Sequence, residues 1–86
     1  MSKAAKTIAH ILWRRGDASV RFEDLRAALR HLGFSERIRG SHHAFSKVGV
    51  AALINLQRDG SHAKAYQVRQ VRAILVEHGL GTETRP

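Results

Sequence analysis

The sequence predicts an α+β domain in which three helices accompany a three-stranded antiparallel sheet, in the order α-α-β-β-β-α. Near both ends of the chain, apolar residues recur every three or four positions, as they do on the buried side of a helix. Between residues 34 and 56 the apolar residues alternate or form short runs separated by glycines, which is typical of strands joined by tight turns. Because short hairpins join consecutive strands, we expect an antiparallel sheet with two helices on one face.

The first two helices are expected to end at glycines. Residues 3–15 form an additional N-terminal helix in this prediction, with Ile8 and Leu12 on its apolar stripe, and the polar segment 16–19 ends it. A second helix begins near Arg21, and Gly33 is placed to cap its C-terminus. Its apolar stripe consists of Phe22, Leu25, Leu29 and Leu32. The N-terminal helix must dock somewhere on the layer that the other elements form.

The strands and the last helix follow without a long linker. We expect strands at 34–39, 41–47 and 51–56, with turns at 39–40 and 48–49, where glycine supplies a positive φ. The last helix is expected over 65–78, with Gly79 in the capping position. Its buried stripe consists of Val68, Val71, Ile74 and Leu75. Residues 81–86 are polar and are expected to be a frayed tail.

Length and composition favour one small folded domain over residues 1–86. Forty-three per cent of the residues are hydrophobic, and 86 residues are too few for two domains. The chain has no cysteine, so it has neither disulfides nor thiolate metal sites. No segment predicts a signal peptide or a membrane span, and we therefore expect a cytoplasmic protein.

Positive charge is concentrated in the middle of the chain. Residues 37–72 contain seven basic side chains and one acid, which gives this segment +6 of the total formal charge of +8. A solvated surface is the alternative explanation, but the regional bias favours a partner rich in phosphate or carboxylate.

Period-two alternation assigns the two adjacent histidines to opposite sides of the sheet. If Phe45 faces the helices, His43 does so too, and His42 faces the uncovered side. Arg37 and Arg39 then also face the uncovered side, beside His42. The residues expected on the helix side are Phe34, Ile38, Ile54 and Leu56, and those expected on the uncovered side of the third strand are Leu53 and Asn55. One bulge would reverse this assignment.

Three segments together resemble the HicA family of toxins. They are residues 29–34 (LRHLGF), 39–45 (RGSHHAF) and 66–75 (YQVRQVRAIL), within a similarity that covers roughly 21–80. Members of this family are small ribonucleases of bacterial toxin–antitoxin pairs, which cleave mRNA without a metal and are neutralised by HicB antitoxins. The resemblance implies a double-stranded-RNA-binding-domain-like fold, no cofactor, and His42 as the essential histidine, since it directly follows the glycine and serine of the motif.

Histidine and arginine suit this chemistry because RNA supplies its own nucleophile, the 2′-hydroxyl. Imidazole can remove or return a proton near neutral pH, and guanidinium groups can stabilise charge on the phosphate. On this hypothesis His42 is the general base or acid, and His43 and His62 are candidates for a second proton carrier. The predicted RNA-binding residues are Arg37, Arg39, Ser41, Lys47 and Lys64.

The same residues also allow interpretations other than a ribonuclease. His43 is otherwise a half-buried packing residue, and His62 an ordinary loop residue. A non-catalytic RNA-binding module of the same fold is the main alternative, and a DNA-binding helix-turn-helix from the first two helices is a weaker one. We expect no metal site, because the basic segment contains a single acid, Asp59, and the histidine spacing matches no zinc motif.

Overall fold

The computed structural model describes residues 2–13 and 16–84 and has the predicted α+β architecture and element order. The helices are α1 (Lys3–Trp13), α2 (Phe22–His31) and α3 (Ala65–Glu77), with a short 3-10 turn, η1 (Asp17–Ser19), between the first two. The strands are β1 (Ser35–Arg39), β2 (His42–Lys47) and β3 (Val50–Gln57), which form one antiparallel sheet in the order β1-β2-β3. Within the described chain, no helix is long and apolar enough to cross a bilayer.

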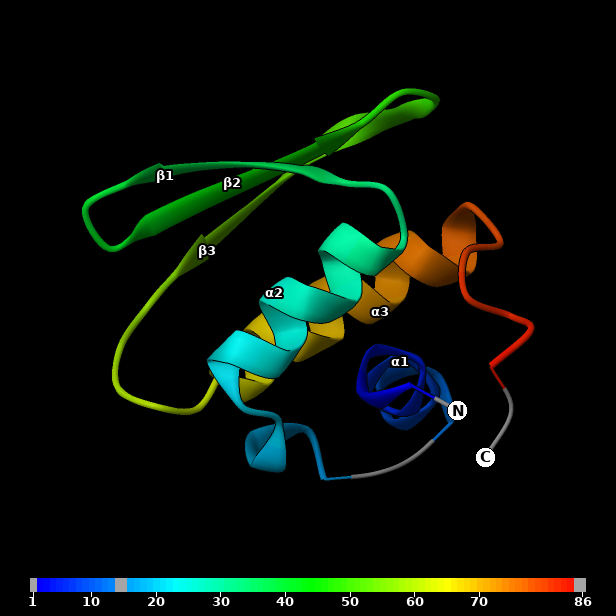
Figure 1. Ribbon diagram of the computed structural model, residues 1–86, viewed down its shortest axis with the longest axis horizontal. Helices are drawn as coiled ribbons and strands as arrows, with labels where there is room; N and C mark the ends of the chain where they lie inside the picture. The colour runs from blue at the N-terminus through cyan, green and yellow to red at the C-terminus, as the bar shows by residue number, and fades with distance from the viewer. Residues whose placement is uncertain (1, 14–15, 85–86) are drawn as a thin grey trace.

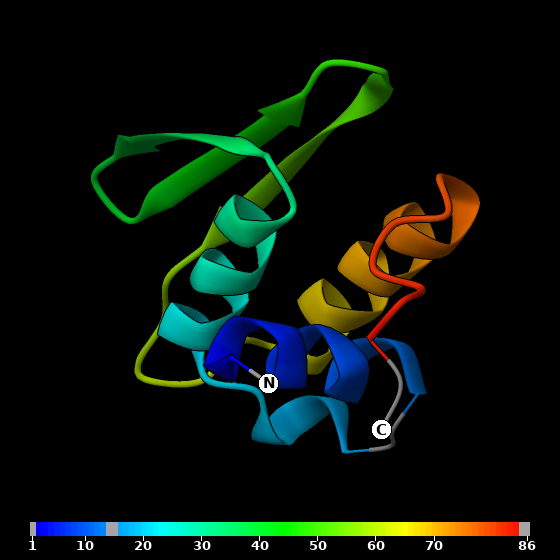
Figure 2. The ribbon, with the colours of Figure 1, turned by 45° about the vertical axis from the view of Figure 1, so that its right-hand side comes forward.

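The elements form three layers. The sheet lies on one side of α2 and α3, and α1 lies on the other side of these two helices (Figures 1 and 2). The docking position of the N-terminal helix, which the sequence left open, is therefore behind the helical layer. Arg72 of α3 donates a hydrogen bond to the carbonyl oxygen of Ile11 in α1 and also pairs with Asp17, so it ties α1 and η1 to the helical layer.

The core lies between the helical layer and the inner side of the sheet. Phe22 of α2 and Phe45 of β2 are its largest fully buried side chains. Ile11 extends the same cluster into α1. Gly33, with a φ of 96°, turns the chain from the end of α2 toward β1, as the capping prediction required, and Phe34 directly after it is buried.

Strand register confirms most of the predicted alternation. His43 and Phe45 face the helices at 4% and 0% exposure, and Ile54, the partner of Phe45, is fully buried as well. The opposite side of the sheet is exposed, and we call it the open face. It consists of Ser35, Arg37, Arg39, His42, Ala44, Ser46, Leu53, Asn55 and Gln57. A register shift between Phe45 and Lys47 leaves this assignment intact, because the inward pairing of Phe45 with Ile54 is kept.

The predicted burial of Ile38 is wrong. Ile38 pairs with His43 and so has the predicted phase, yet it is 53% exposed. The physical reason is that the hairpin joining β1 and β2 projects past the end of α2 in both views, so no helix covers its tip (Figures 1 and 2). Alternation fixes the direction of a side chain but not whether another element reaches it.

The expectation of a frayed tail does not hold for residues 81–84. Gly81 and Thr84 are buried, and the indole Nε1 of Trp13 donates a hydrogen bond of 2.8 Å to the carbonyl oxygen of Thr84. The C-terminal segment therefore packs on α1, as Figure 2 shows. Residues 14–15 of the predicted first helix and residues 85–86 of the tail lie outside the described chain.

Candidate nucleic-acid interface

The two adjacent histidines begin β2 directly after a tight turn. Gly40 has a φ of 60° and Ser41 follows it, so the chain reverses between Arg39 and His42, which are cross-strand partners. His42 is also the partner of Gln57 on β3. Directly opposed residues have Cβ atoms about 5 Å apart. The imidazole of His42 is therefore exposed on the open face between a guanidinium on one neighbouring strand and an amide on the other.

The next row of side chains across the open face consists of Arg37, Ala44 and Asn55: Ala44 on the central strand pairs with Arg37 on β1 and with Asn55 on β3. In the following row Ser35 pairs with Ser46, so the side chains of the central strand in this region, Ala44 and Ser46, are both small. A hollow of about 450 Å³ results, which we call the open-face hollow. It is lined by Ser35, Glu36, Arg37, Ala44, Ser46 and Leu53.

Arg37 and Arg39 carry charge that the fold leaves uncompensated. In the part of the chain that the structure describes, neither has an acidic side chain within ion-pair distance. Other basic residues differ: Arg58 pairs with Glu23, Lys64 with Asp59 at 2.8 Å, and Arg72 with Asp17. The open face can therefore accept anions without first breaking an internal salt bridge.

His43 has a different environment beneath the sheet. Its Nδ1 lies 2.8 Å from Oε2 of Glu36, whose side chain is 6% exposed. Arg26 of α2 grips the same carboxylate with two hydrogen bonds, from Nε at 2.6 Å and from Nη2 at 3.0 Å. The ring of His43 also meets the Phe22 ring edge-on, with centroids 5.0 Å apart. His43 is thus a buried member of a polar network that joins the hairpin to α2.

Charge on this network is stabilised by hydrogen bonding. Burial opposes ionisation of Glu36, but hydrogen bonds from Arg26 and His43 outweigh it and hold the pKa of that carboxyl below its ordinary value. The hydrogen bond to Glu36 raises the pKa of Arg26, against the opposing effect of burial. Glu23 extends the network, because it accepts from Arg26 at 2.7 Å and also from Arg58, whose hydrogen bond lowers its pKa.

This network was not predicted from the sequence, although the sequence contains one signal of it. Glu36 lies between Phe34 and Ile38 in the inward phase of β1, where an acidic side chain requires a partner. Its partner Arg26 lies on another element ten positions away, and only the docking of α2 on the sheet brings the two together. The small residues of the open-face hollow, Ala44 and Ser46, were also not predicted as site residues.

The remaining predicted site residues are spread over the molecule. Ser41 lies in the hairpin turn, where its carbonyl oxygen accepts from the backbone N–H of Arg58 at 2.8 Å. Lys47 lies at the far end of β2, where its Nζ approaches Gly33 at the end of α2. Lys64 precedes α3 in the helical layer. His62 is exposed, and its Nδ1 lies 2.9 Å from the hydroxyl oxygen of Ser61. Its backbone forms an isolated β-bridge with that of Arg21 at the start of α2, so His62 belongs to the helical layer too.

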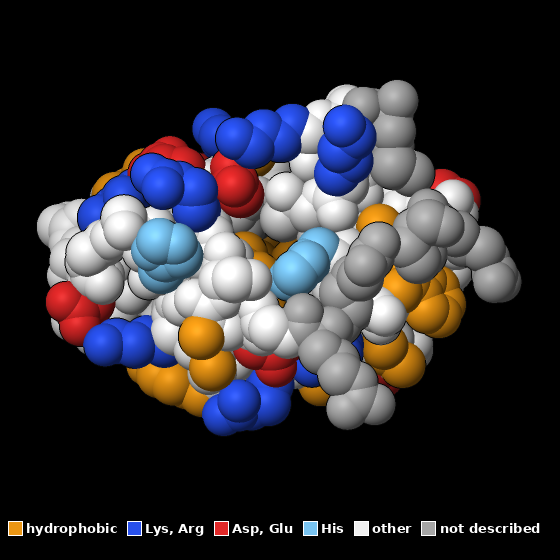
Figure 3. Space-filling model, turned by 90° about the horizontal axis from the view of Figure 1, so that it is seen from below, with side chains coloured by type: hydrophobic (Ala, Val, Ile, Leu, Met, Phe, Trp, Pro, Cys, Tyr) orange, Lys and Arg blue, Asp and Glu red, His pale blue; other side chains and the backbone are white. Residues whose placement is uncertain are grey.

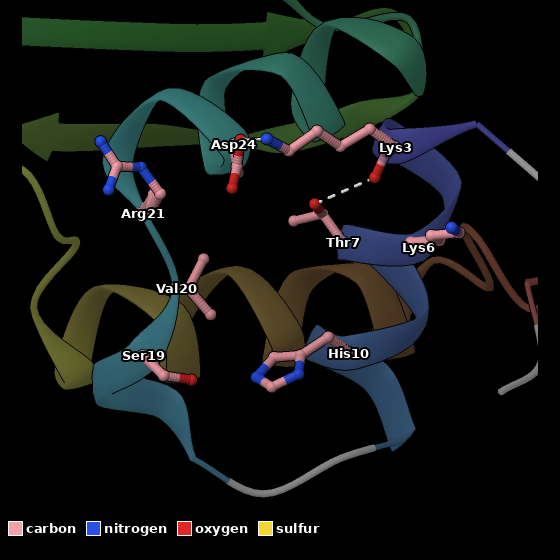
Figure 4. A pocket seen from close by; sticks show the side chains of 8 residues that line it. All are labelled: Lys3, Lys6, Thr7, His10, Ser19, Val20, Arg21 and Asp24. Carbon is pink, nitrogen blue, oxygen red and sulfur yellow. Dashed lines mark hydrogen bonds and ion pairs between the residues drawn. The ribbon is translucent and has the colours of Figure 1, made fainter.

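A second hollow lies on the other side of the molecule from the open face. Seen from below in Figure 3, Lys and Arg side chains lie at the top, left and bottom edges of this surface, and histidine side chains lie nearer its middle. Figure 4 shows the hollow between α1, η1 and the start of α2, with a volume of about 290 Å³. Its upper rim carries Lys3, which is paired with Asp24 at 3.4 Å. None of the predicted site residues lines it.

No three histidine or acidic side chains in residues 2–13 and 16–84 are arranged so that they could share a metal ion. No family model matches the chain. No match was found among curated proteins, and none among solved structures. Support for a function therefore comes from the residues of the open face and from the resemblance of the sequence motifs to HicA toxins.

Proposed function

We propose that this chain is the toxin of a toxin–antitoxin pair, a metal-independent endoribonuclease of the HicA kind that cleaves mRNA in the cytoplasm. The observation that carries the proposal is the exposed imidazole of His42 on the open face. His42 lies directly opposite Arg39, and Arg37 is on the same side of β1, two residues from Arg39. The histidine that the motif singles out is thus also the histidine that a bound polyanion would meet.

The proposed mechanism uses the 2′-hydroxyl of the substrate as nucleophile. His42 removes its proton, the 2′-oxygen attacks the adjacent phosphorus, and the bond to the 5′-oxygen breaks. Arg39 and Arg37 hold the phosphate and stabilise the added negative charge of the transition state. General base catalysis of this kind contributes roughly 10²–10⁴-fold. Gln57 is placed to orient the substrate through its amide.

The same geometry supports a mechanism in which no second histidine carries a proton. His43 faces the helices and is bound to Glu36, and His62 lies in the helical layer, so neither shares the open face with His42. Protonation of the leaving 5′-oxygen then comes from water. A single imidazole acting as base predicts a cleavage rate that rises with pH to a plateau, in place of a bell-shaped profile.

The fold is consistent with a double-stranded-RNA-binding-domain-like core. The run α2-β1-β2-β3-α3, with both helices on one side of an antiparallel sheet, has the element order of that fold. On this proposal α1 is an addition behind the core. A HicB-type antitoxin is the proposed partner, with acidic groups that meet Arg37, Arg39 or Lys64 and cover His42.

Replacement of His42 by alanine tests the proposal. The His42→Ala protein should lose RNA cleavage and growth arrest but keep most of its RNA affinity, since the side chain is exposed and the arginines remain. His31→Ala is the matched control, because His31 is also exposed but lies at the end of α2. Growth arrest by the His42→Ala protein would exclude this mechanism. If the wild-type chain binds RNA but never cleaves it, the alternative, a non-catalytic RNA-binding module, would be favoured.

A further inference from the structure

The open-face hollow has the composition of a site for a flat, partly apolar group. Its floor is made by Ala44 and Ser46 on the central strand, where larger side chains would fill it. Leu53 on β3 forms one wall, and Arg37 on β1 lies across the sheet from it. The hollow thus lies between an apolar side chain and a guanidinium that has no acidic partner among the described residues.

Leu53 is 53% exposed, although its neighbour Ile54 is fully buried. A single exposed leucine is ordinary on a protein surface. This one lies in the part of β3 where the pairing with β2 shifts register, and it lines the same hollow as Ser46. Burial of its exposed side by a ligand would gain hydrophobic free energy that the free protein does not realise.

The hollow is close to His42 along the same strand. Ala44 and Ser46 lie two and four residues from His42, which corresponds to about 7 and 14 Å at the rise of an antiparallel strand. A group bound in the hollow is therefore beside the phosphate at His42 and does not occupy the same place. The chemistry that fits is a nucleobase of a neighbouring nucleotide, since proteins hold unpaired bases between apolar or aromatic side chains and arginine planes.

We propose that the open-face hollow binds one unpaired RNA base next to the cleaved phosphate, with Leu53 against the base and Arg37 at the opposite rim. The inference extends the proposed function, because it assumes that RNA lies on the open face. It makes the substrate locally single-stranded, since a base in a duplex is stacked and paired and cannot enter a hollow in a sheet. Leu53 and Ser46 then become specificity-determining residues.

The test separates base recognition from backbone attraction. A short 2′-O-methyl RNA, which lacks the nucleophile and is not cleaved, is compared with the same backbone carrying abasic residues. Wild-type protein should bind the base-bearing strand about tenfold more tightly, the scale of one partly buried contact. Ser46→Leu, which fills the hollow, and Leu53→Ser, which removes its wall, should reduce this preference toward one. The dependence of affinity on salt should stay unchanged, because the phosphate contacts remain.

Val76→Ser is the matched control, since Val76 is an exposed apolar residue of α3 at 62% exposure and lies outside the hollow. All substituted side chains face solvent, and thermal melting of each variant confirms folding. A preference that survives in both hollow variants, or tighter binding of a blunt duplex than of a single strand, would overturn the inference and leave the proposed function intact. A wild-type protein that binds neither strand would overturn the proposed function itself.

Discussion

Replacement of Glu36 by glutamine should destabilise the fold more than any other single change of an acidic side chain in the described chain. Glu36 is 6% exposed and accepts hydrogen bonds from Arg26 and His43. Glutamine keeps the shape but loses the charge and presents an NH₂ group to donors. Arg26, 14% exposed, would then keep its hydrogen bond to Glu23 on the solvent side and at most one hydrogen bond to the remaining amide oxygen, in place of two hydrogen bonds to a charged carboxylate.

The expected loss in free energy of unfolding depends on which partners the substitution leaves to Arg26 and His43. Breaking a buried ion pair by removing one charge costs about 3–5 kcal/mol, and the retained contact with Glu23 argues for the lower end, about 3 kcal/mol. A domain of 86 residues has a total free energy of unfolding of roughly 4–13 kcal/mol. With a urea m-value near 1–1.5 kcal/mol/M, the midpoint of unfolding should fall by about 2–3 M.

Urea unfolding followed by circular dichroism measures this change. Glu77→Gln is the control, because Glu77 lies in α3 with its side chain 72% exposed, and its replacement should change stability by less than about 0.5 kcal/mol. A loss below about 1 kcal/mol for Glu36→Gln would refute the reasoning. It would mean that the network does not hold the hairpin to α2.

The same carboxyl predicts the direction of the pH dependence. The pKa of Glu36 is lower in the folded state than its ordinary value, so its contribution to stability is complete above the pKa of the unfolded chain, about 4.3. That contribution is lost as the pH falls through the lower folded pKa. Wild-type stability should therefore decline on acidification below about pH 5, and the decline should be shallower in Glu36→Gln.

Three further predictions concern the back of the molecule and the open face. Gly81→Ala should lower the free energy of unfolding by about 2–3 kcal/mol, because a Cβ there would lie 2.5 Å from Cγ2 of Ile8. Gly60→Ala is the control, since Gly60 also has a positive φ but open surroundings; it should cost clearly less, and equal melting temperatures for the two variants would contradict the packing of residue 81 on α1. Arg72→Met should lower stability by about 2 kcal/mol and speed hydrogen exchange in α1, since it removes the bonds to Ile11 and Asp17; unchanged exchange would show that α1 docks without them. Arg39→Ala should reduce the salt dependence of RNA binding by about one phosphate contact, whereas Arg69→Ala on the exposed side of α3 should not, and equal slopes for both would argue against the open face.

Much of the fold could be predicted because local patterns are strong in this chain. The stripes of α2 and α3, the glycines at 33, 40, 49 and 79, and the alternation in β2 each depend on neighbours in sequence. Alternation also placed His42 outward and His43 inward without any knowledge of the helices.

The predictions that were wrong concern burial, which depends on elements that are distant in the sequence. Ile38 has the inward phase but projects past α2, and residues 81–84 are polar in sequence but pack on α1. Neither outcome is written in a local pattern, because burial depends on which element arrives from elsewhere in the chain.

The sequence by itself determined the elements, their order, the side of the sheet that each histidine faces and the basic character of the middle segment. Only the tertiary structure decided that Glu36 meets Arg26 and His43, that Arg37 and Arg39 keep uncompensated charge while Arg58 and Lys64 do not, and that small residues leave a hollow beside His42. The physical reason is that secondary structure follows from neighbours along the chain, whereas charge pairing and cavities follow from residues that docking brings together.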